Sequence, residues 1–274
     1  MSDFIGTKLT MNLGERSYDI IVKRGSLENL YQFARLDRRV AVVTDSGVPA
    51  QYAQMVADQC KDAAIITVPQ GEASKSFKIL ETVLRQMLDF GMGRGDLVVA
   101  VGGGVVGDLA GFAASIYMRG IDFINCPTTT LSMIDSSIGG KTAVDLGDTK
   151  NIVGAFWQPK LVIVDPDTLS TLPRRHFING LAEAVKAGLL ADPELFSIFE
   201  KEDVDDRIGD IICRSLRFKK SIVEQDETEQ GMRKALNFGH TIGHGIEAVK
   251  GIKGRRTVGL FHGECVALGM LPMI

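Results

Sequence analysis

The sequence predicts an α/β protein in which a doubly wound parallel sheet is followed by an all-α region. In its first half, short runs rich in Val and Ile alternate with amphipathic stretches, which is typical of strand-helix-strand units. After Pro166 the β-branched runs stop, and longer segments with a helical period of 3.6 residues take over. The chain of 274 residues also exceeds what one hydrophobic core usually serves. We therefore expect two domains, covering residues 1–172 and 173–274.

The elements follow from local patterns in chain order. Continuous apolar runs predict strands over 39–44, 63–68, 96–101, 121–125 and 161–164. Apolar residues at helical spacing predict helices over 76–90 and 107–117 between these strands, and over 174–190, 203–223 and 235–249 after them. The domain boundary is placed at Leu172 and Pro173, because Pro173 follows a polar run and fits neither a helix interior nor a central strand.

The composition excludes several classes of protein. A net charge of -3 with 24% charged residues argues against a polybasic nucleic-acid binder. The four cysteines are scattered, with no CxxC pair, which favours reduced thiols over a disulfide framework. The amino terminus lacks the charged and apolar segments of a signal peptide, and no window approaches 18 uninterrupted apolar residues. A cytoplasmic enzyme with no membrane or nucleic-acid partner is expected.

A glycine motif indicates a nucleotide site. Gly102-Gly-Gly-Val-Val-Gly-Asp108 follows the most apolar predicted strand and opens a helix, so that its backbone can approach a pyrophosphate at the helix amino terminus. The motif lies on the third strand of the run, whereas the usual dinucleotide fingerprint lies on the first, which argues against ordinary Rossmann geometry. Asp45, at the end of the first predicted strand, fits the role of the ribose-binding acid better than Asp122 does.

A second segment rich in glycine, residues 134–145, lacks the spacing of a P-loop, so we reject nucleoside triphosphate binding. Its Lys141, together with Lys150 and Asn151, lies on non-periodic chain where loops commonly place functional groups. Clustered lysines suit phosphate and carboxylate ligands.

The histidines indicate a metal site. Three of the four, His240, His244 and His262, fall close together in the sequence, and the four-residue spacing of the first two places them on one face of a helix. The fourth, His176, precedes Glu183. Glu183 and Lys186 lie three residues apart among apolar residues, which indicates burial, and a buried carboxylate needs a cation or a metal ion. One carboxylate and two imidazoles form a ligand set of catalytic zinc.

These motifs together resemble those of the 3-dehydroquinate synthases. The resemblance rests on Gly102 to Asp108, Arg119-Gly-Ile, Pro127-Thr-Thr129, Asp135 to Lys141, Lys150-Asn151, Leu181-Ala-Glu183, Asn237 to His244 and His262-Gly-Glu264, and it spans nearly the whole chain in order. It implies a Rossmann-like amino-terminal domain, an NAD cofactor, a homodimer, and Zn²⁺ or Co²⁺ held by Glu183, His240 and His262.

The resemblance also implies roles for other residues. NAD would be bound by Asp45, Glu72, Lys75, Gly103, Gly104, Val105, Val106, Gly107, Asp108, Thr128, Thr129, Lys141, Lys150, Thr168, Leu169, Ser170 and Thr171. The phosphorylated sugar acid would meet Arg119, Asp135, Lys141, Lys150, Asn151, Lys186, Lys219, Arg233, Asn237 and His244, with Arg119 reaching across the dimer interface.

By the same resemblance, the reaction converts 3-deoxy-D-arabino-heptulosonate 7-phosphate to 3-dehydroquinate through transient oxidation by NAD. The nearest alternative is a related sugar-phosphate cyclase, such as a 2-deoxy-scyllo-inosose or valiolone-type synthase. A metal-dependent polyol dehydrogenase of the same fold and a non-catalytic relative are more distant alternatives. Family members extend some tens of residues beyond the position of Ile274, so the resemblance further implies a truncated chain that lacks helices of the second domain.

Overall fold

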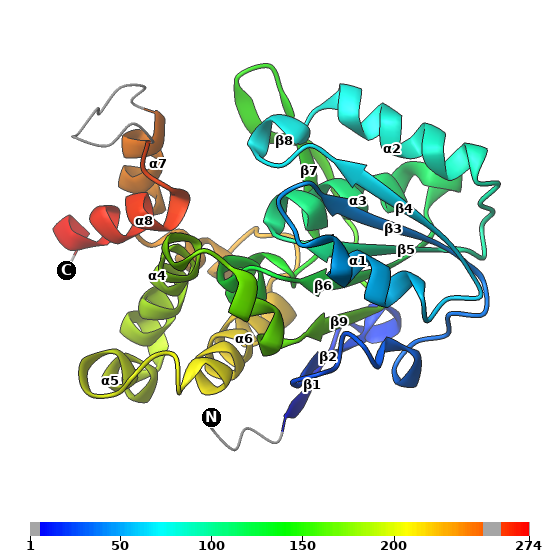
Figure 1. Cartoon of the computed structure of the whole chain (residues 1–274). Helices are drawn as coiled ribbons and strands as arrows, with labels where there is room; N and C mark the ends of the chain where they lie inside the picture. The colour runs from blue at the N-terminus through cyan, green and yellow to red at the C-terminus, as the bar shows by residue number, and fades with distance from the viewer. Residues whose placement is uncertain (1–5, 249–258, 274) are drawn as a thin grey trace.

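A computed structural model describes residues 6–248 and 259–273, and it confirms the expected α/β architecture (Figure 1). Seven strands form one sheet in the order β1-β2-β9-β6-β5-β3-β4. The strands are β1 (Thr7–Met11), β2 (Tyr18–Val22), β3 (Arg39–Asp45), β4 (Asp62–Val68), β5 (Leu97–Gly102), β6 (Asp122–Pro127) and β9 (Leu161–Val164). All neighbours run parallel except β1 and β2, which pair antiparallel at one edge.

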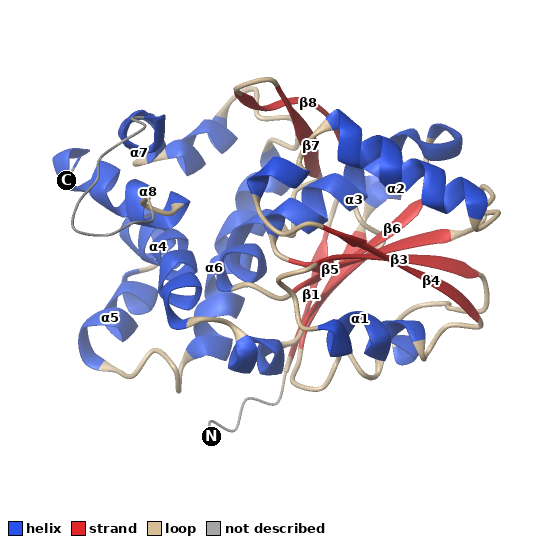
Figure 2. Cartoon of the chain, turned by 45° about the horizontal axis from the view of Figure 1, so that its top comes forward, coloured by secondary structure: helices blue, strands red, loops and turns tan. Residues whose placement is uncertain are grey.

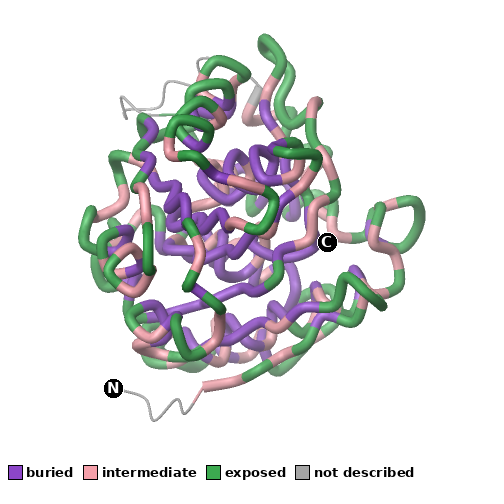
Figure 3. The backbone as a smooth tube through the Cα atoms, turned by 90° about the vertical axis from the view of Figure 1, so that its right-hand side faces the viewer, coloured by how far each residue is buried: buried purple, intermediate pink, exposed green. Residues whose placement is uncertain are grey.

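Helices cover both faces of the sheet, as Figure 2 shows. Helix α1 (Ala50–Ala57) lies on one face, and α2 (Phe77–Asp89) and α3 (Gly104–Ile116) lie on the other. β3 and β5 are buried over almost their whole length, so these central strands read as continuous apolar segments. Figure 3 shows buried chain segments in the interior of the molecule and exposed segments around them. A separate antiparallel hairpin, β7 (Lys141–Leu146) and β8 (Thr149–Phe156), packs beside α3.

The helical region contains α4 (Arg174–Ala191), α5 (Pro193–Lys201), α6 (Ile208–Gln225), α7 (His240–Ala248) and α8 (His262–Met270). Its core is shared with the sheet, because Ile20 and Val164 belong to the same hydrophobic cluster as Leu195, Ile211 and Leu216. This cluster therefore crosses the predicted boundary at residues 172 and 173, and that division of the chain remains a prediction.

Several elements differ from the sequence prediction. Lys141, Lys150 and Asn151, expected on non-periodic chain, lie on the paired strands β7 and β8. Strands β1 and β2 were not expected, since β1 alternates in exposure and the apolar run of β2 covers only Ile20 to Val22. Helix α6 starts at Ile208, because Asp203 accepts a hydrogen bond from the amide of Asp205 (2.9 Å) and holds a turn before it. A helix was expected from residue 235, but the chain up to Asn237 forms a 3-10 turn. Helix α7 starts at His240, directly after Gly239, whose left-handed backbone (φ 77°) separates the two elements. Its expected end at 249 lies outside the described residues.

Candidate active site

The glycine motif lies at the point where the order of the sheet reverses. The chain runs outward from β3 to β4 and then returns to β5 on the other side of β3, so the carboxyl ends of β3 and β5 are adjacent. Ligands of open α/β sheets bind in the crevice at such a point. Asp45 ends β3, and Gly103 and Gly104 follow β5. The glycine motif follows β5, and not the first strand of the parallel run, β3, as in an ordinary Rossmann fold. It nevertheless lies at the switch point, where such folds bind a dinucleotide.

The backbone at Gly103 and Gly104 has the shape of a cradle for an anion. Helix α3 begins here without a side-chain cap, so its first amide groups keep their donors. A Cβ at Gly103 would lie 3.0 Å from Cγ2 of Thr129, and one at Gly104 would lie 3.0 Å from Oγ of Ser136. Side chains at these positions would fill the cradle, so the residues present fit a dinucleotide phosphate.

Behind the cradle, Lys75 connects three predicted site residues. Its buried ammonium lies 2.6 Å from Oδ2 of Asp108, donates a hydrogen bond to Asn151 on β8, and lies 3.9 Å from Oε1 of Glu72. Burial raises the pKa of Asp108, and the neighbouring ammonium opposes that change. Lys75 therefore connects the segment before α2 with α3, through Asp108, and with the β7–β8 hairpin, through Asn151.

The remaining residues predicted to bind NAD lie along the same edge. Asp45 uses Oδ1 to accept hydrogen bonds from the amides of Gly47 (2.7 Å) and Val48 (3.2 Å). Thr129 accepts one from the amide of Ser132 (3.2 Å), and Thr128 is buried. The 3-10 turn Pro166–Thr171, which includes Thr168, Leu169, Ser170 and Thr171, is held by the Tyr52 hydroxyl, 3.0 Å from Oγ1 of Thr171.

Four predicted metal-site and catalytic residues converge from α4, α7 and α8. The candidate ligand nitrogens of His240, His244 and His262 all lie within 4.8 Å of one another. Oε1 of Glu183 is 3.4 Å from Nε2 of His240 and 3.7 Å from Nε2 of His262. The structure thus brings the expected ligands together, and it places a ring nitrogen of His244 within 4.8 Å of those of the other two histidines.

Close backbone packing produces this convergence. A Cβ at Gly263 would lie 1.9 Å from the carbonyl oxygen of Asn179 on α4, and one at Gly269 would lie 2.1 Å from the carbonyl oxygen of Gly239 before α7. Only glycine permits contacts this short. Helix α8 consequently lies against both neighbours, and its first residue, His262, faces the other ligands.

The donor set fits a divalent metal ion. Glu183 is 3% exposed, and neither of its carboxylate oxygens has a hydrogen-bond partner of good geometry among the described residues, although Lys186 forms an ion pair with it. A buried carboxylate beside imidazole nitrogens is the kind of site that binds zinc or cobalt.

The charges of the ligands are interdependent. Burial raises the pKa of Glu183, but His262 and Lys186 outweigh this and leave the pKa below its usual range. Contacts with Glu183 and Glu247 raise the pKa of His262 to about 9, whereas burial lowers the pKa of His240 and of His244. A bound metal ion would displace the proton of His262, because a ligand imidazole is neutral.

A cationic cluster adjoins Glu183. Lys219 lies 2.8 Å from Oδ1 of Asp135, and Lys186 donates to the carbonyl of Leu236 (2.7 Å). Burial alone would raise the pKa of Asp135, yet the charges of Lys219 and Lys186 hold it well below its usual range. A small cavity is lined by Asp135, Glu183, Lys186, Ser215, Lys219 and Leu236, among others. The arrangement offers ammonium groups to an anionic ligand beside the metal site.

A second cluster joins the hairpin to the turn before α7. Lys141 forms an ion pair with Glu229, whose Oε1 accepts a hydrogen bond from Asn237 (3.2 Å). Arg233 is 1% exposed and donates to the carbonyl oxygens of Glu227 and Gly139, the latter at 3.0 Å. Sequence reasoning missed Glu229, which carries no motif of its own.

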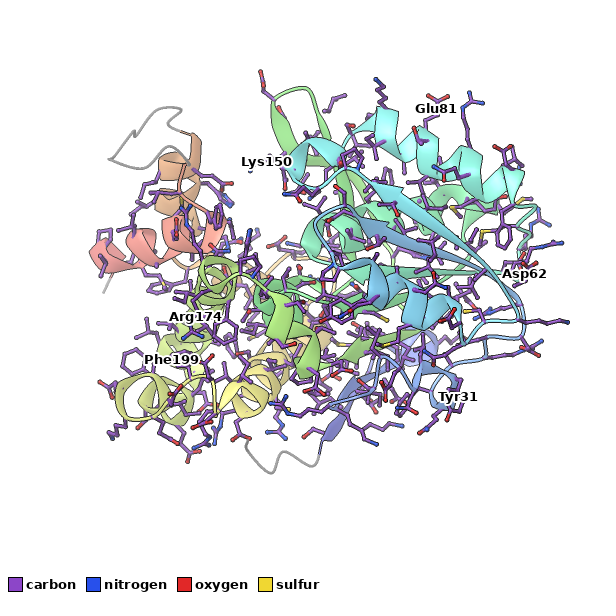
Figure 4. All side chains as sticks on the ribbon, viewed as in Figure 1. Tyr31, Asp62, Glu81, Lys150, Arg174 and Phe199 are labelled. Carbon is purple, nitrogen blue, oxygen red and sulfur yellow. The ribbon has the colours of Figure 1, made fainter. Side chains whose placement is uncertain are left out.

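Lys150 connects the hairpin to the metal site. It lies on the side of the hairpin that faces α7 (Figure 4), where its ammonium is 2.6 Å from Oε1 of Glu247. The other oxygen of Glu247 is 3.5 Å from Nδ1 of His262. Glu247 was also missed by sequence reasoning, although its position seven residues after His240 places it two turns further along α7.

Two predicted residues lie outside these clusters. Arg119 is exposed on the turn after α3, with φ 68°, and its side chain has no partner among the described residues. His176 stacks on Phe261, with ring centroids 4.7 Å apart, and does not join the other histidines. The four cysteines are free thiols, as expected. Within the described residues, no helix is long and apolar enough to cross a membrane.

Comparison with known proteins identifies the family. Residues 65–179 match the family model described as 3-dehydroquinate synthase N-terminal, and residues 180–273 match the one described as 3-dehydroquinate synthase C-terminal. The chain is 44% identical to the 3-dehydroquinate synthase of Pelobacter propionicus and 43% identical to that of Thermodesulfovibrio yellowstonii, over 96% of this chain and 76% of each relative.

Solved structures give the same grouping. A 2-deoxy-scyllo-inosose synthase complexed with carbaglucose-6-phosphate, NAD⁺ and Co²⁺ superposes with a TM-score of 0.86 at 29% identity, over 96% of this chain and 75% of that one. A 2-epi-5-epi-valiolone synthase from Streptomyces hygroscopicus with NAD⁺ and Zn²⁺ bound gives 0.79 at 30% identity, over 94% and 74%. The chain belongs to the 3-dehydroquinate synthase family.

Proposed function

We propose that this chain is the enzyme that converts 3-deoxy-D-arabino-heptulosonate 7-phosphate to 3-dehydroquinate and phosphate in the shikimate pathway. The observation that carries the proposal is the convergence of Glu183, His240, His244 and His262 beside the buried lysines of α4 and α6. Family matches over residues 65–273 and a relative that aligns with 96% of the chain support the same substrate.

Two bound groups supply the chemistry that side chains lack. Asp45, Lys75 and the residues from Gly103 to Asp108 would hold NAD at the glycine cradle, where it would supply reversible hydride transfer at C5 of the substrate. Glu183, His240 and His262 would hold Zn²⁺ or Co²⁺, which would supply Lewis-acid polarisation of the C5 hydroxyl. Relatives with these groups bound support both assignments.

The side chains bind charge and move protons. Oxidation at C5 makes the neighbouring C-H acidic, so loss of that proton expels phosphate; reduction, ring opening and aldol closure then form the carbocycle without net redox change. His244 is a suitable proton carrier, because burial and the nearby His262 lower its pKa and keep its imidazole neutral. Lys141, Lys150, Asn151, Lys186, Lys219, Arg233 and Asn237 are the candidates for holding the phosphate and carboxylate, with Asp135 orienting Lys219.

The test is phosphate release with zinc and only trace NAD. Release that far exceeds the NAD present, with no accumulation of NADH, is expected, because only a recycled cofactor gives both. Net NADH production would instead indicate a polyol dehydrogenase. Turnover of a phosphorylated hexose without a carboxylate, and none of the heptulosonate phosphate, would indicate another sugar-phosphate cyclase.

We also propose that the enzyme is a cytoplasmic homodimer in which Arg119 completes the site of its partner. The exposed, left-handed backbone at Met118 and Arg119 projects a cation beside the exposed side chain of Ile116. Light scattering would report the mass of a dimer, and mixing Arg119→Ala with His262→Ala chains would restore partial turnover if sites are shared. A monomer at assay concentrations would contradict this proposal, and cell fractionation would test the compartment.

A further inference from the structure

One face of α4 carries three polar residues at a spacing of four. Arg175, Asn179 and Glu183 therefore lie in line along the helix. Each lies close to the first turn of α8: the Arg175 guanidinium contacts the carboxylate of Glu264, Oδ1 of Asn179 accepts from the Glu264 amide (3.2 Å), and Glu183 approaches His262. The face that carries a metal ligand thus also holds the helix that carries another.

The contact between Arg175 and Glu264 is two-pronged. Nε of Arg175 lies 2.8 Å from Oε1 and Nη2 lies 2.7 Å from Oε2 of Glu264, and both side chains are about a third exposed or less. Such a paired contact fixes direction as well as distance, which a lysine cannot reproduce.

Glu264 in turn holds the backbone of Phe261, the residue before His262. Its Oε2 accepts a hydrogen bond from the amide of Phe261 (2.9 Å), which closes the start of α8. The Arg175 guanidinium also lies over the Phe261 ring, 4.0 Å from its centroid. Arg175 therefore holds the backbone on one side of His262, and the Gly263 contact with Asn179 holds it on the other.

We propose that Arg175, acting through Glu264, is a positioning residue that sets where His262 lies relative to Glu183 and so determines metal affinity. The inference rests on the metal site of the proposed function and deepens it. Arg175 does not touch the metal ligands through any contact that the structure records; its effect is on the placement of α8. Partners of this indirect kind change metal affinity by about 10- to 100-fold.

The test measures metal binding directly, without turnover. Metal-free protein is titrated with Co²⁺ while the visible absorption of the bound ion is followed, and with Zn²⁺ in competition with a chromophoric chelator. Arg175→Ala and Glu264→Gln are expected to weaken binding about tenfold or more and to alter the Co²⁺ spectrum, because the imidazole is displaced. Arg175→Lys should recover only part of the loss.

Arg174→Ala is the matched control. Arg174, labelled in Figure 4, is the neighbour of Arg175 on α4; it pairs with the exposed Asp205 and lies over Phe177. The substitution therefore removes a guanidinium from the same turn of α4 without removing a contact with α8. Its Co²⁺ spectrum and metal affinity should match those of the unaltered chain. NAD affinity, measured on every variant, reports whether the sheet region remains folded.

Glycine substitutions test the same placement without removing a charge. Gly263→Ala drives a methyl group into the Asn179 carbonyl and should weaken metal binding at least as much as Arg175→Ala, whereas Gly245→Ala on α7 meets nothing within 4 Å and should not. If Arg175→Ala does not fold, Glu264→Gln and Gly263→Ala decide the question. If the folded variants bind Co²⁺ as tightly as the unaltered chain does, the inference about Arg175 is wrong, while the proposed function stands. Failure of the unaltered chain to bind metal would overturn both the inference and the proposed function.

Discussion

The sheet region and the helical region place their functional groups by different means. In the sheet, Asp45 and the cradle at Gly103 and Gly104 lie where two adjacent parallel strands end, so the backbone topology alone brings them together. In the helical region, Glu183, His240 and His262 come from three helices that meet through side-chain and glycine contacts. The candidate cofactor site therefore follows from the fold, whereas the candidate metal site depends on individual tertiary contacts.

This contrast predicts that single substitutions separate the two sites. His262→Ala should have the largest effect: it removes one of the expected metal ligands and should lower Zn²⁺ affinity by more than about a hundredfold, with turnover lost in parallel. NAD affinity should change less than about twofold, because the cradle lies on the sheet. Metal titration and NAD titration on the same protein check both statements.

His244→Ala sharpens the comparison within the helical region. The structure places a ring nitrogen of His244 within 4.8 Å of those of the other two histidines, but the family resemblance gives it a proton-carrying role. We expect the variant to retain Zn²⁺ and to lose about 10²- to 10⁴-fold in turnover, as removal of a general acid or base does. Loss of the metal would instead make His244 a ligand.

Lys75→Met is the converse test, because it changes the cofactor region and should leave the metal site intact. It leaves the partly exposed carboxylate of Asp108 (21% exposed) without its ammonium partner and should lower the free energy of unfolding by about 1 to 3 kcal/mol. NAD affinity should fall, and Zn²⁺ affinity should stay within about twofold. Urea unfolding and the two titrations measure these effects, with the exposed Lys78→Met on α2 as the control. A Zn²⁺ affinity that fell together with NAD affinity would break the proposed separation.

The smallest effect is expected at the start of α5. Asp192 accepts from the Leu195 amide (3.0 Å) and contacts Arg214 (2.9 Å); although burial raises its pKa, these contacts leave it below the usual value of 3.8. Its charge therefore stabilises the fold above pH 3.8, and this stabilisation disappears as the pH falls through the lower pKa of the folded state.

Asp192→Asn keeps the cap and removes the charge, so it should lower the free energy of unfolding by about 0.5 to 1 kcal/mol near neutral pH. The difference from the unaltered chain should shrink as urea unfolding is repeated toward pH 3. Glu194→Gln, whose more exposed carboxylate contacts the same arginine, should show a smaller difference at every pH. A difference that grew toward acid would contradict the assignment.

The sequence predicted most of the sheet, because β3, β5, β6 and β9, which carry the cofactor edge, are buried on both faces and mostly apolar. It did not predict β1, whose exposed positions interrupt the apolar pattern, or β2, whose apolar run covers only Ile20 to Val22. The candidate metal ligands were recognisable because histidines are few and their spacing is informative. Glu229, Glu247 and Arg175 were not, since their partners Lys141, Lys150 and Glu264 lie about 90 residues away in sequence.

The first two strands have a consequence for how the chain is made. Met11 and Ile20 pack in one cluster with Ile211, Leu216 and Val223 of α6, so the first two strands share a core with a helix far along the chain. A ribosome adds about 5 to 20 residues per second, so about 10 to 40 s pass between the synthesis of β1 and β2 and that of α6. During that interval the apolar face of β1 and β2 is open to a chaperone or to another nascent chain.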